Sequence, residues 1–166
     1  MLTELNIGMI SIRRACQKHC KQISKIESES FPTPWTLAEI SKFIKDEDVL
    51  AFVAETEEEE IVGYMYITRD GPDYYEIINI AVKEEYRRKK VATQMVEQLK
   101  KAVFTKANNG LLQAIIVDYN LQAHLFFKDL GFRAVQILTD HYDSDNDNQA
   151  YVFEFMHFKG KARFKA

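Results

Sequence analysis

The sequence predicts an α/β fold of the α+β type, in which a mixed sheet of six or seven strands is flanked by about four helices. Short apolar runs typical of strands alternate with stretches whose apolar residues recur at helical spacing, and no linker or repeat interrupts them. The length of 166 residues and the hydrophobic content of 46% suffice for one full core. We therefore expect one domain over residues 1–158, followed by a basic, frayed tail over residues 159–166.

The first half of the chain is expected to form three strands and two helices. These are a strand over residues 10–12, a helix with the stripe Cys16, Cys20, Ile23 and Ile26, a helix after residue 36, and strands over 49–54 and 61–68. Thr36 and Glu39 have the spacing of a capping box, which is typical of a helix start. We interpret the acidic run Glu57–Glu60 as a solvated hairpin turn.

The second half is expected to add four strands and two helices. They are a strand over residues 75–82, a helix with the stripe Val91, Met95, Leu99 and Val103, a strand over 112–117, a helix over about 122–130, and a hairpin of strands over 133–138 and 150–157. Gly71 and Pro72 break the chain before these elements, and Asn108–Gly110 is expected to end the long helix. The almost wholly apolar run 112–117 predicts a strand that is covered on both faces.

The charge and hydropathy of the chain bear on its partners. A net charge of −3 argues against a dedicated nucleic-acid binder. No apolar run approaches the roughly 20 residues that span a bilayer, and the N-terminus lacks the apolar run of a secretory signal. We expect a cytoplasmic monomer or homodimer without a nucleic-acid or membrane partner.

Two groups of residues have spacings that metal sites use. Cys16, His19 and Cys20 could supply zinc ligands from one helix, but a closed zinc site needs a fourth ligand, and two packing cysteines are the alternative. A calcium-loop pattern is formed by Asp143, Asp145, Asp147 and Glu154. Ordinary hairpin-turn residues give the same pattern, because no helix is predicted before it. We therefore predict no metal site.

Residues 77–92 predict an anion-binding turn. An apolar strand leads into the four cations Arg87, Arg88, Lys89 and Lys90, and a helix begins after them. The N–H groups and the positive dipole end of that helix favour a phosphate, and the cations strengthen the field. A solvated basic turn or a weak nucleic-acid contact is the alternative interpretation.

The six residues from Arg87 to Ala92 resemble the cofactor-binding motif of the GNAT acetyltransferase superfamily, in which Arg/Gln-x-x-Gly-x-Gly/Ala follows a hydrophobic strand. Arg87 and Ala92 fit this motif, and Lys90 stands where it has its central glycine. The resemblance implies a GNAT-like, mostly antiparallel sheet and acetyl-coenzyme A as the acetyl donor. It leaves open whether Lys90 binds the phosphates or blocks them.

Three further segments resemble parts of the same superfamily in the same order. The stretch Asn120–Phe132 resembles Asn-x-x-Ala-x-x-x-Tyr-x-x-x-Gly-Phe, and Phe31–Trp35 resembles the Phe-x-x-Pro-Trp segment of the ribosomal-protein-alanine (RimI-like) branch. His141–Tyr142 and Gln149–Val152 resemble the Tyr-Tyr, turn, Asp-Ala hairpin of N-terminal acetyltransferases.

The resemblance implies binding roles for individual residues. The cofactor-binding residues are Ile80, Ala81, Val82, Arg87, Arg88, Lys89, Lys90, Val91, Ala92, Thr93, Asn120 and Phe127. In the family, the strand binds the pantetheine arm through its backbone and the turn binds the phosphates. The substrate-binding residues are Trp35, His141 and Tyr142, with core packing as an equal alternative for Trp35 and Tyr142.

The resemblance also places a catalytic base on the central strand. Many family members have a glutamate eleven residues before the first motif position, which is Glu76 here. A carboxylate in an apolar strand is costly unless it is solvated or paired, which favours catalysis; a solvated strand end is the alternative. The glutamate of RimI-like enzymes corresponds to Ile115, which cannot act as a base.

No residue of the sequence is an obvious proton donor for the thiolate. Family enzymes usually place a tyrosine where this chain has Phe127, and a phenyl ring has no proton to give. Tyr142 is the substitute we select for catalysis, with Tyr119 and solvent as alternatives. His124 lies on the same helix as Phe127 and is expected to face outward.

The residues available as base and proton donor bear on which amine is acetylated. An α-amine with a pKa of about 7.8 is neutral roughly a quarter of the time near pH 7.4, whereas a lysine amine is neutral roughly one time in a thousand. A site with a weak base would therefore favour a protein or peptide N-terminus, which we predict as the acceptor. The alternatives are a small amine, such as a polyamine or aminoglycoside, and a degenerate relative that binds acetyl-coenzyme A or a partner without turnover.

Overall fold

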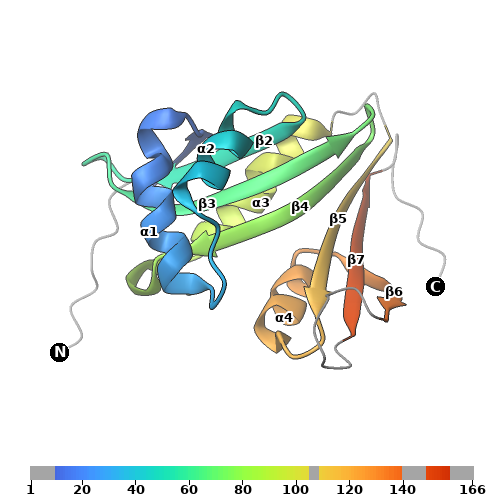
Figure 1. Cartoon of the computed structure of the whole chain (residues 1–166). Coiled ribbons are helices and arrows are strands. Elements are labelled where there is room, and N and C mark those ends of the chain that lie inside the picture. Colours follow the sequence, from blue (N-terminus) through green and yellow to red (C-terminus); the bar gives the residue numbers. More distant parts are fainter. Residues whose placement is uncertain (1–9, 105–108, 140–148, 158–166) are drawn as a thin grey trace. The chain divides into compact units, whose positions relative to one another are not determined.

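The computed structural model describes residues 10–104, 109–139 and 149–157. Within them the sheet has the strand order β1-β2-β3-β4-β5-β7-β6 (Figure 1). The strands are β1 (Ser11–Arg14), β2 (Val49–Glu55), β3 (Ile61–Asp70), β4 (Tyr74–Val82), β5 (Gly110–Val117), β6 (Arg133–Leu138) and β7 (Ala150–His157). The helices are α1 (Cys20–Ser30), α2 (Leu37–Lys45), α3 (Val91–Val103) and α4 (Leu121–Asp129), with short 3-10 turns η1 (Gln17–His19) and η2 (Glu84–Tyr86).

The sheet is mixed and mostly antiparallel, as predicted. β4 and β5 run parallel, whereas β1 with β2, β5 with β7 and β6 with β7 run antiparallel. The predicted hairpin of β6 and β7 has the boundaries that the sequence indicated. The chain divides into two compact units.

The first unit contains the residues up to Ile67 together with Asn79–Lys100. In it α1 and α2 lie on one face of β2 and β3, and α3 lies on the other face (Figure 1). Tyr64 of β3 hydrogen-bonds to Glu27 of α1, while a Cβ at Gly63 would stand 3.4 Å from Met95 Sδ of α3. Alternate residues of β3 therefore face opposite helical layers. Its fully buried side chains include Ile23, Ile26, Ile40, Val53, Met65, Ile67 and Leu99.

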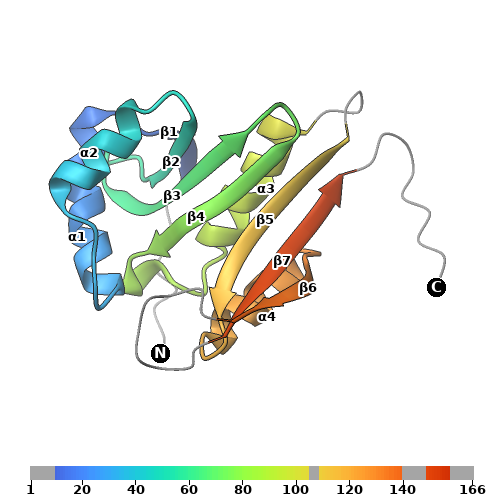
Figure 2. The same cartoon turned by 45° about the vertical axis from the view of Figure 1, so that its right-hand side comes forward.

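The second unit contains Thr68–Ile78 and the residues from Lys101 onward. Helix α4 lies beside β5, β7 and β6 (Figure 2). The His124 ring of α4 contacts the rings of Tyr151 and Phe153 on β7, at centroid distances of 5.2 and 5.1 Å. These contacts hold α4 against the strands.

The start of α2 confirms the predicted capping box. Thr36 Oγ1 accepts a hydrogen bond from the Glu39 N–H at 3.3 Å, and the Thr36 N–H donates to Glu39 Oε2 at 2.7 Å. The two bonds satisfy backbone donors at opposite sides of the first helical turn.

Two helix boundaries differ from the prediction. Cys16 is extended, with φ of −141°, so α1 begins only at Cys20 and the predicted stripe loses its first member. α3 ends at Val103 rather than at Asn108–Gly110. The ring of Phe104, the next residue, packs on Gly110. Residues 105–108 lie outside the described part of the chain.

The predicted covering of β5 on both faces is wrong. Leu112, Ala114 and Ile116 are buried, whereas the residues between them are half-buried. Only one face of this strand is therefore fully covered, and its apolar run has the alternation of an amphipathic strand.

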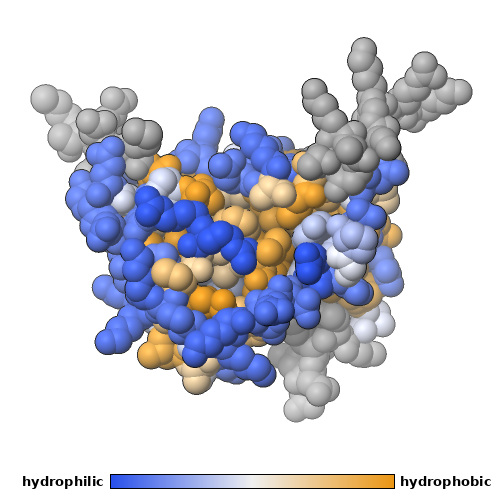
Figure 3. All heavy atoms as spheres, turned by 90° about the horizontal axis from the view of Figure 1, so that it is seen from above, coloured by the Kyte–Doolittle hydropathy of each residue, from blue (hydrophilic) through white to orange (hydrophobic). Residues whose placement is uncertain are grey.

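Polar and apolar side chains share the surface. Hydrophilic residues cover much of the face shown in Figure 3, with hydrophobic residues visible between them. Among the helices of the described ranges, none combines the length and apolar character that crossing a membrane requires.

Candidate active site

The basic loop, residues 87–93, comprises the end of the connection from β4 to α3 and the first residues of α3. The Lys83 N–H donates to the Val62 carbonyl at 2.9 Å, which ties the start of the connection to β3. Arg88 and Lys90 have left-handed backbone conformations, with φ of 60° and 62°. Lys90 stands at the glycine position of the motif, so the loop has a backbone conformation that favours glycine although a side chain is present.

The basic loop presents backbone donors at the start of a helix. Among the described residues, none accepts a hydrogen bond from the backbone N–H groups of residues 88–93. Gln94 is the first residue whose N–H bonds back into the helix, to the Lys90 carbonyl at 2.9 Å. The side chains of Arg88 and Lys90 are exposed. Unpaired N–H groups, a positive helix end and cations together can bind a phosphate.

Arg87 holds the basic loop in place. Its Nε donates to the Val82 carbonyl at 3.0 Å, and its Nη2 lies 3.5 Å from Ser30 Oγ. The guanidinium therefore joins the loop to the end of β4 and the end of α1.

Glu60 supports the same connection from the β2–β3 turn. Its carboxylate pairs with Lys83 and accepts a hydrogen bond from the Tyr86 hydroxyl at 3.2 Å. The hydrogen bond from Lys83 lowers the pKa of Glu60, and the same bond raises the pKa of Lys83. The hairpin turn itself is confirmed, but Glu60 is part of this ion pair rather than a simply solvated residue.

The backbone of β4 changes its pairing along the strand. Its register with β5 covers Tyr74–Ile77. Ile80, Ala81 and Val82 come after this ladder, which leaves the backbone groups on that edge unpaired by β5. Ala81 and Val82 are buried and Ile80 is half-buried. These residues and the basic loop come together, because Val82 is the acceptor of the Arg87 bond.

Glu76 lies near the start of β4 and faces Gln113 in the register with β5. It is half-buried rather than fully solvated. Its carboxylate interacts with Tyr74: burial raises the pKa of Tyr74, and the charge of Glu76 raises it further. The position of Glu76 is compatible with both alternatives, a base or a polar residue near a strand end.

Trp35 lies in the segment between α1 and α2 and is half-buried. Its ring stacks on Phe43 of α2 with centroids 4.5 Å apart and packs at 5.6 Å on Tyr66 of β3. These ring contacts leave both interpretations of Trp35 open, core packing and acceptor binding.

Glu27 was not among the residues predicted for the site. Its carboxylate is 1% exposed and accepts hydrogen bonds from the Trp35 N–H at 2.9 Å, from Asn79 Nδ2 at 3.1 Å and from the Tyr64 hydroxyl. Burial raises the pKa of this carboxyl, and the bonds from Trp35 and Asn79 act in the opposite direction. The signal was present in the sequence, because Glu27 lies four residues after Ile23 on the apolar stripe of α1.

The second block of the resemblance lies on α4. Asn120 caps this helix, its Oδ1 accepting a hydrogen bond from the Ala123 N–H at 3.1 Å. Phe127 is 3% exposed, with its ring 5.0 Å from that of Phe132.

The expectation that His124 faces outward is wrong, since its ring contacts β7 and its Nε2 lies 2.9 Å from the Val117 carbonyl. Tyr119 is 73% exposed.

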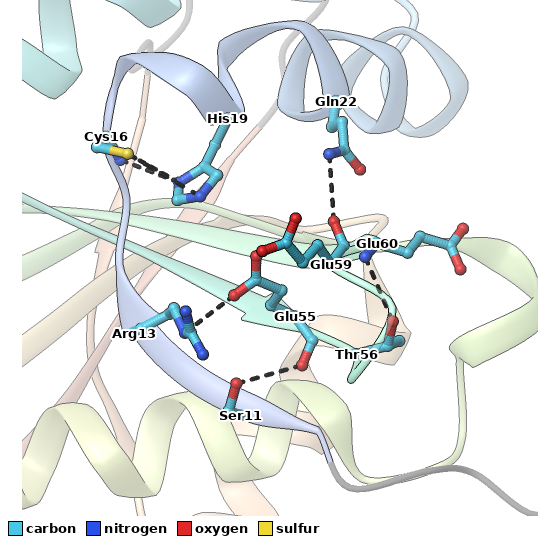
Figure 4. A network of polar contacts seen from close by, with 9 residues as sticks. All are labelled: Ser11, Arg13, Cys16, His19, Gln22, Glu55, Thr56, Glu59 and Glu60. Carbon is cyan, nitrogen blue, oxygen red and sulfur yellow. Dashed lines mark hydrogen bonds and ion pairs between the residues drawn. The ribbon is translucent and has the colours of Figure 1, made fainter.

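The cysteines do not share one face. Figure 4 shows Cys16 beside the His19 ring, with its N–H donating to Nδ1 at 3.0 Å. Cys16 is exposed and Cys20 is buried, so only Cys20 is a packing cysteine. In the part of the chain that the structure describes, no three His, Cys, Asp or Glu side chains are grouped to hold a metal ion. His141, Tyr142 and the aspartates at 143, 145 and 147 lie outside that part.

Comparison with protein families and curated proteins identifies relatives. A model of the acetyltransferase (GNAT) family matches residues 20–132. An uncharacterized N-acetyltransferase from Methanocaldococcus jannaschii is 28% identical over 136 residues, covering 82% of this chain and 86% of the relative. A protein named N-alpha-acetyltransferase from Saccharolobus solfataricus is 25% identical, covering 82% of this chain and 88% of the relative.

Solved structures show the same fold at lower identity. The ribosomal-protein-S18-alanine N-acetyltransferase from Escherichia coli has a TM-score of 0.79 at 17% identity, covering 95% of this chain and all of that chain. An aminoglycoside 6'-N-acetyltransferase complexed with coenzyme A has a TM-score of 0.74 at 14% identity, covering 88% of this chain and 96% of that chain. The fold is therefore shared by N-acetyltransferases with different acceptors. The family match spans more than half of the sequence and confirms the resemblance and the enzyme class that it implied, so the chain belongs to the acetyltransferase (GNAT) family.

Proposed function

We propose that the protein transfers the acetyl group of acetyl-coenzyme A to the α-amine of a protein or peptide. The observation that carries this proposal is the basic loop, in which Arg88 and Lys90 have left-handed backbones and the N–H groups of residues 88–93 bind no described acceptor. Such a loop at a helix start fits the pyrophosphate of coenzyme A.

The residues of the first unit have complementary roles in this proposal. The loop N–H groups and the exposed side chains of Arg88 and Lys90 bind phosphate oxygens, while Arg87 keeps the loop against β4. Backbone groups of Ile80, Ala81 and Val82, which lie beyond the ladder with β5, bind the pantetheine arm. Acetyl-coenzyme A supplies the acetyl group as a thioester, and the chain binds and orients it.

The choice of an α-amine as the acceptor rests on its protonation near neutral pH. A neutral amine is required for attack, and an α-amine is neutral far more often than a lysine amine near neutral pH. Glu76 is the group we assign to accept the proton, and Asn120 and Phe127 are assigned to cofactor binding. Trp35, His141 and Tyr142 are assigned to the acceptor peptide, with Tyr142 also protonating the thiolate. The relative named N-alpha-acetyltransferase supports this choice of acceptor.

The test compares three acceptors at equal concentration in an assay for the free thiol of coenzyme A. One is a short peptide with a free N-terminus, the second is the same peptide with a blocked N-terminus and an internal lysine, and the third is spermidine. We expect turnover with the first only. Preference for spermidine would replace the peptide by a small amine, and binding of acetyl-coenzyme A without turnover of any acceptor would indicate a non-catalytic relative.

The assignment of Glu76 is tested with Glu76→Gln in the same assay. Loss of the base should lower kcat by about a hundredfold near neutral pH, with partial recovery at higher pH as more amine becomes neutral by itself. An unchanged pH profile would show that Glu76 is not the base. Glu154→Gln on β7 is the matched control for the loss of a half-buried strand carboxylate.

A further inference from the structure

We propose that Glu27 is a positioning residue that fixes the acceptor segment, residues 31–36, and joins it to β4. The inference rests on the proposed function, since it concerns how the acceptor and the acetyl donor are held for reaction. Glu27 does not touch substrate itself, because its side chain is buried.

The carboxylate of Glu27 collects donors from three separate elements. Oε1 accepts the Trp35 N–H at 2.9 Å, and Trp35 belongs to the acceptor segment. Oε2 accepts Asn79 Nδ2 of β4 at 3.1 Å and the Tyr64 hydroxyl of β3. A buried ionised carboxylate is stable only when such donors surround it, so the positions of the three elements depend on one another.

The other described hydrogen bonds of the acceptor segment lie at its two ends, and at Thr36 they are the capping-box bonds with Glu39. Phe31 N–H donates to the Glu27 carbonyl at 3.0 Å and closes α1. Pro32, Thr33 and Pro34 are exposed, and the two prolines limit the backbone freedom of the segment. The Trp35 ring packs on the rings of Phe43 and Tyr66. The bond to Glu27 therefore holds the Trp35 N–H between the end of α1 and the capping box of α2.

The same carboxylate reaches the strand that we assign to the acetyl donor. Asn79 immediately precedes Ile80, the first residue whose backbone we propose to bind the pantetheine arm. Glu27 thus connects the acceptor segment with the donor strand through two hydrogen bonds on one side chain. Small displacements of reacting groups cost large factors in rate, so this connection should affect acetyl transfer more than donor binding.

The experiment replaces Glu27 by Gln and uses Glu29→Gln as the matched control. Glu29 lies on the same helix, is exposed, and makes a surface ion pair with Lys25 at 4.0 Å. In Glu27→Gln an amide group replaces one acceptor oxygen, so at least one of the three donors loses its partner. We expect kcat/KM for the peptide to fall about tenfold or more, while the Kd for acetyl-coenzyme A changes less than about twofold.

Fluorescence gives a reading that does not depend on turnover. Trp35 is the only tryptophan of the chain, so its emission and its quenching by acrylamide report the acceptor segment directly. We expect more quenching in Glu27→Gln than in the natural protein and Glu29→Gln. This result would support the inference even if peptides prove not to be the acceptor, which separates its failure from that of the proposed function.

A second variant keeps the inference testable if Glu27→Gln does not fold. Tyr64→Phe removes one donor to Glu27 and retains the ring, and a smaller change in the same direction is expected in both quenching and kcat/KM. Equal losses of peptide kcat/KM and acetyl-coenzyme A affinity, or unchanged quenching and kinetics in folded variants, would overturn the assignment of Glu27 as a positioning residue.

Discussion

Lys90 occupies a backbone conformation that side chains disfavour. Its φ of 62° lies in the left-handed region, where a residue with a Cβ costs roughly 1–2 kcal/mol relative to the right-handed region. Arg88 is in the same region, with φ of 60°. Strain of this kind is retained where the surrounding structure or a function compensates for it, and two cations beside unpaired N–H groups suit an anionic ligand.

Replacement of Lys90 by glycine separates the strain from the charge. Lys90→Gly should raise the free energy of unfolding by about 0.5 kcal/mol, because relief of left-handed strain exceeds the greater entropy of glycine in the unfolded chain. It should also weaken acetyl-coenzyme A binding severalfold through loss of one cation. Urea unfolding and calorimetric titration measure the two effects. Tighter binding would mean instead that the Lys90 side chain obstructs the phosphates.

Lys89→Gly is the control for this comparison. Lys89 has the same charge and a neighbouring place in the basic loop, but its φ is not positive. Glycine there should lower the free energy of unfolding, because no strain is relieved and the contact of Lys89 Nζ with the Tyr86 ring is lost. Equal stability changes in the two variants would argue against strain at Lys90.

At the scale of elements, Glu60 links the β2–β3 turn to η2 and the start of the basic loop. Its partners Lys83 and Tyr86 both lie between β4 and the loop. Because the Glu60 side chain is 40% exposed, solvent screens the pair and its contribution to stability stays below about 1 kcal/mol. The main role of the Glu60–Lys83 pair is to fix the position at which the basic loop begins.

Glu60→Gln should reduce stability in a way that depends on pH. The pKa of Glu60 is lowered in the folded protein, so its contribution is present above its ordinary value of 4.5 and is lost as pH falls through the folded pKa. The difference between the natural protein and the variant should therefore be measurable by urea unfolding at neutral pH and absent in strong acid. Glu58→Gln in the same turn should show no difference at either pH. A difference that persists in acid would exclude the ion pair as its cause.

Elements with a clear local pattern were predictable from the sequence, and those shaped by distant contacts were not. The boundaries of β6 and β7 and the capping box at Thr36 follow from neighbouring residues. α3 ends at Val103, before the predicted stop, and the next residue, Phe104, packs against Gly110, a contact that no local pattern contains. In the candidate site, the motif spacing located the basic loop, but the left-handed backbone of Lys90 and the donors around Glu27 appear only in three dimensions.

At the scale of the whole molecule, charge is distributed unevenly. The chain has a net charge of −3, yet four consecutive cations stand at residues 87–90. A ligand with several phosphate charges is thus repelled by the molecule as a whole and attracted by one loop. Exposed charges separated by more than the Debye length, about 10 Å at 0.1 M salt, are largely screened from each other, so the local attraction should dominate near contact.

The salt dependence of the Kd shows whether attraction to the basic loop or repulsion by the net charge controls the binding of acetyl-coenzyme A. We expect the Kd of acetyl-coenzyme A to rise severalfold between about 20 and about 300 mM NaCl, because salt screens the attraction to the basic loop more than it relieves the distant repulsion. Arg88→Gln should weaken binding at low salt and flatten this dependence. Lys45→Gln, at the exposed end of α2, changes the net charge equally and should leave the slope intact. Calorimetry across the salt series measures all three proteins. A Kd that falls with salt, or equal slopes in the three, would mean that the loop cations do not bind the phosphates and that net charge governs the approach of the donor.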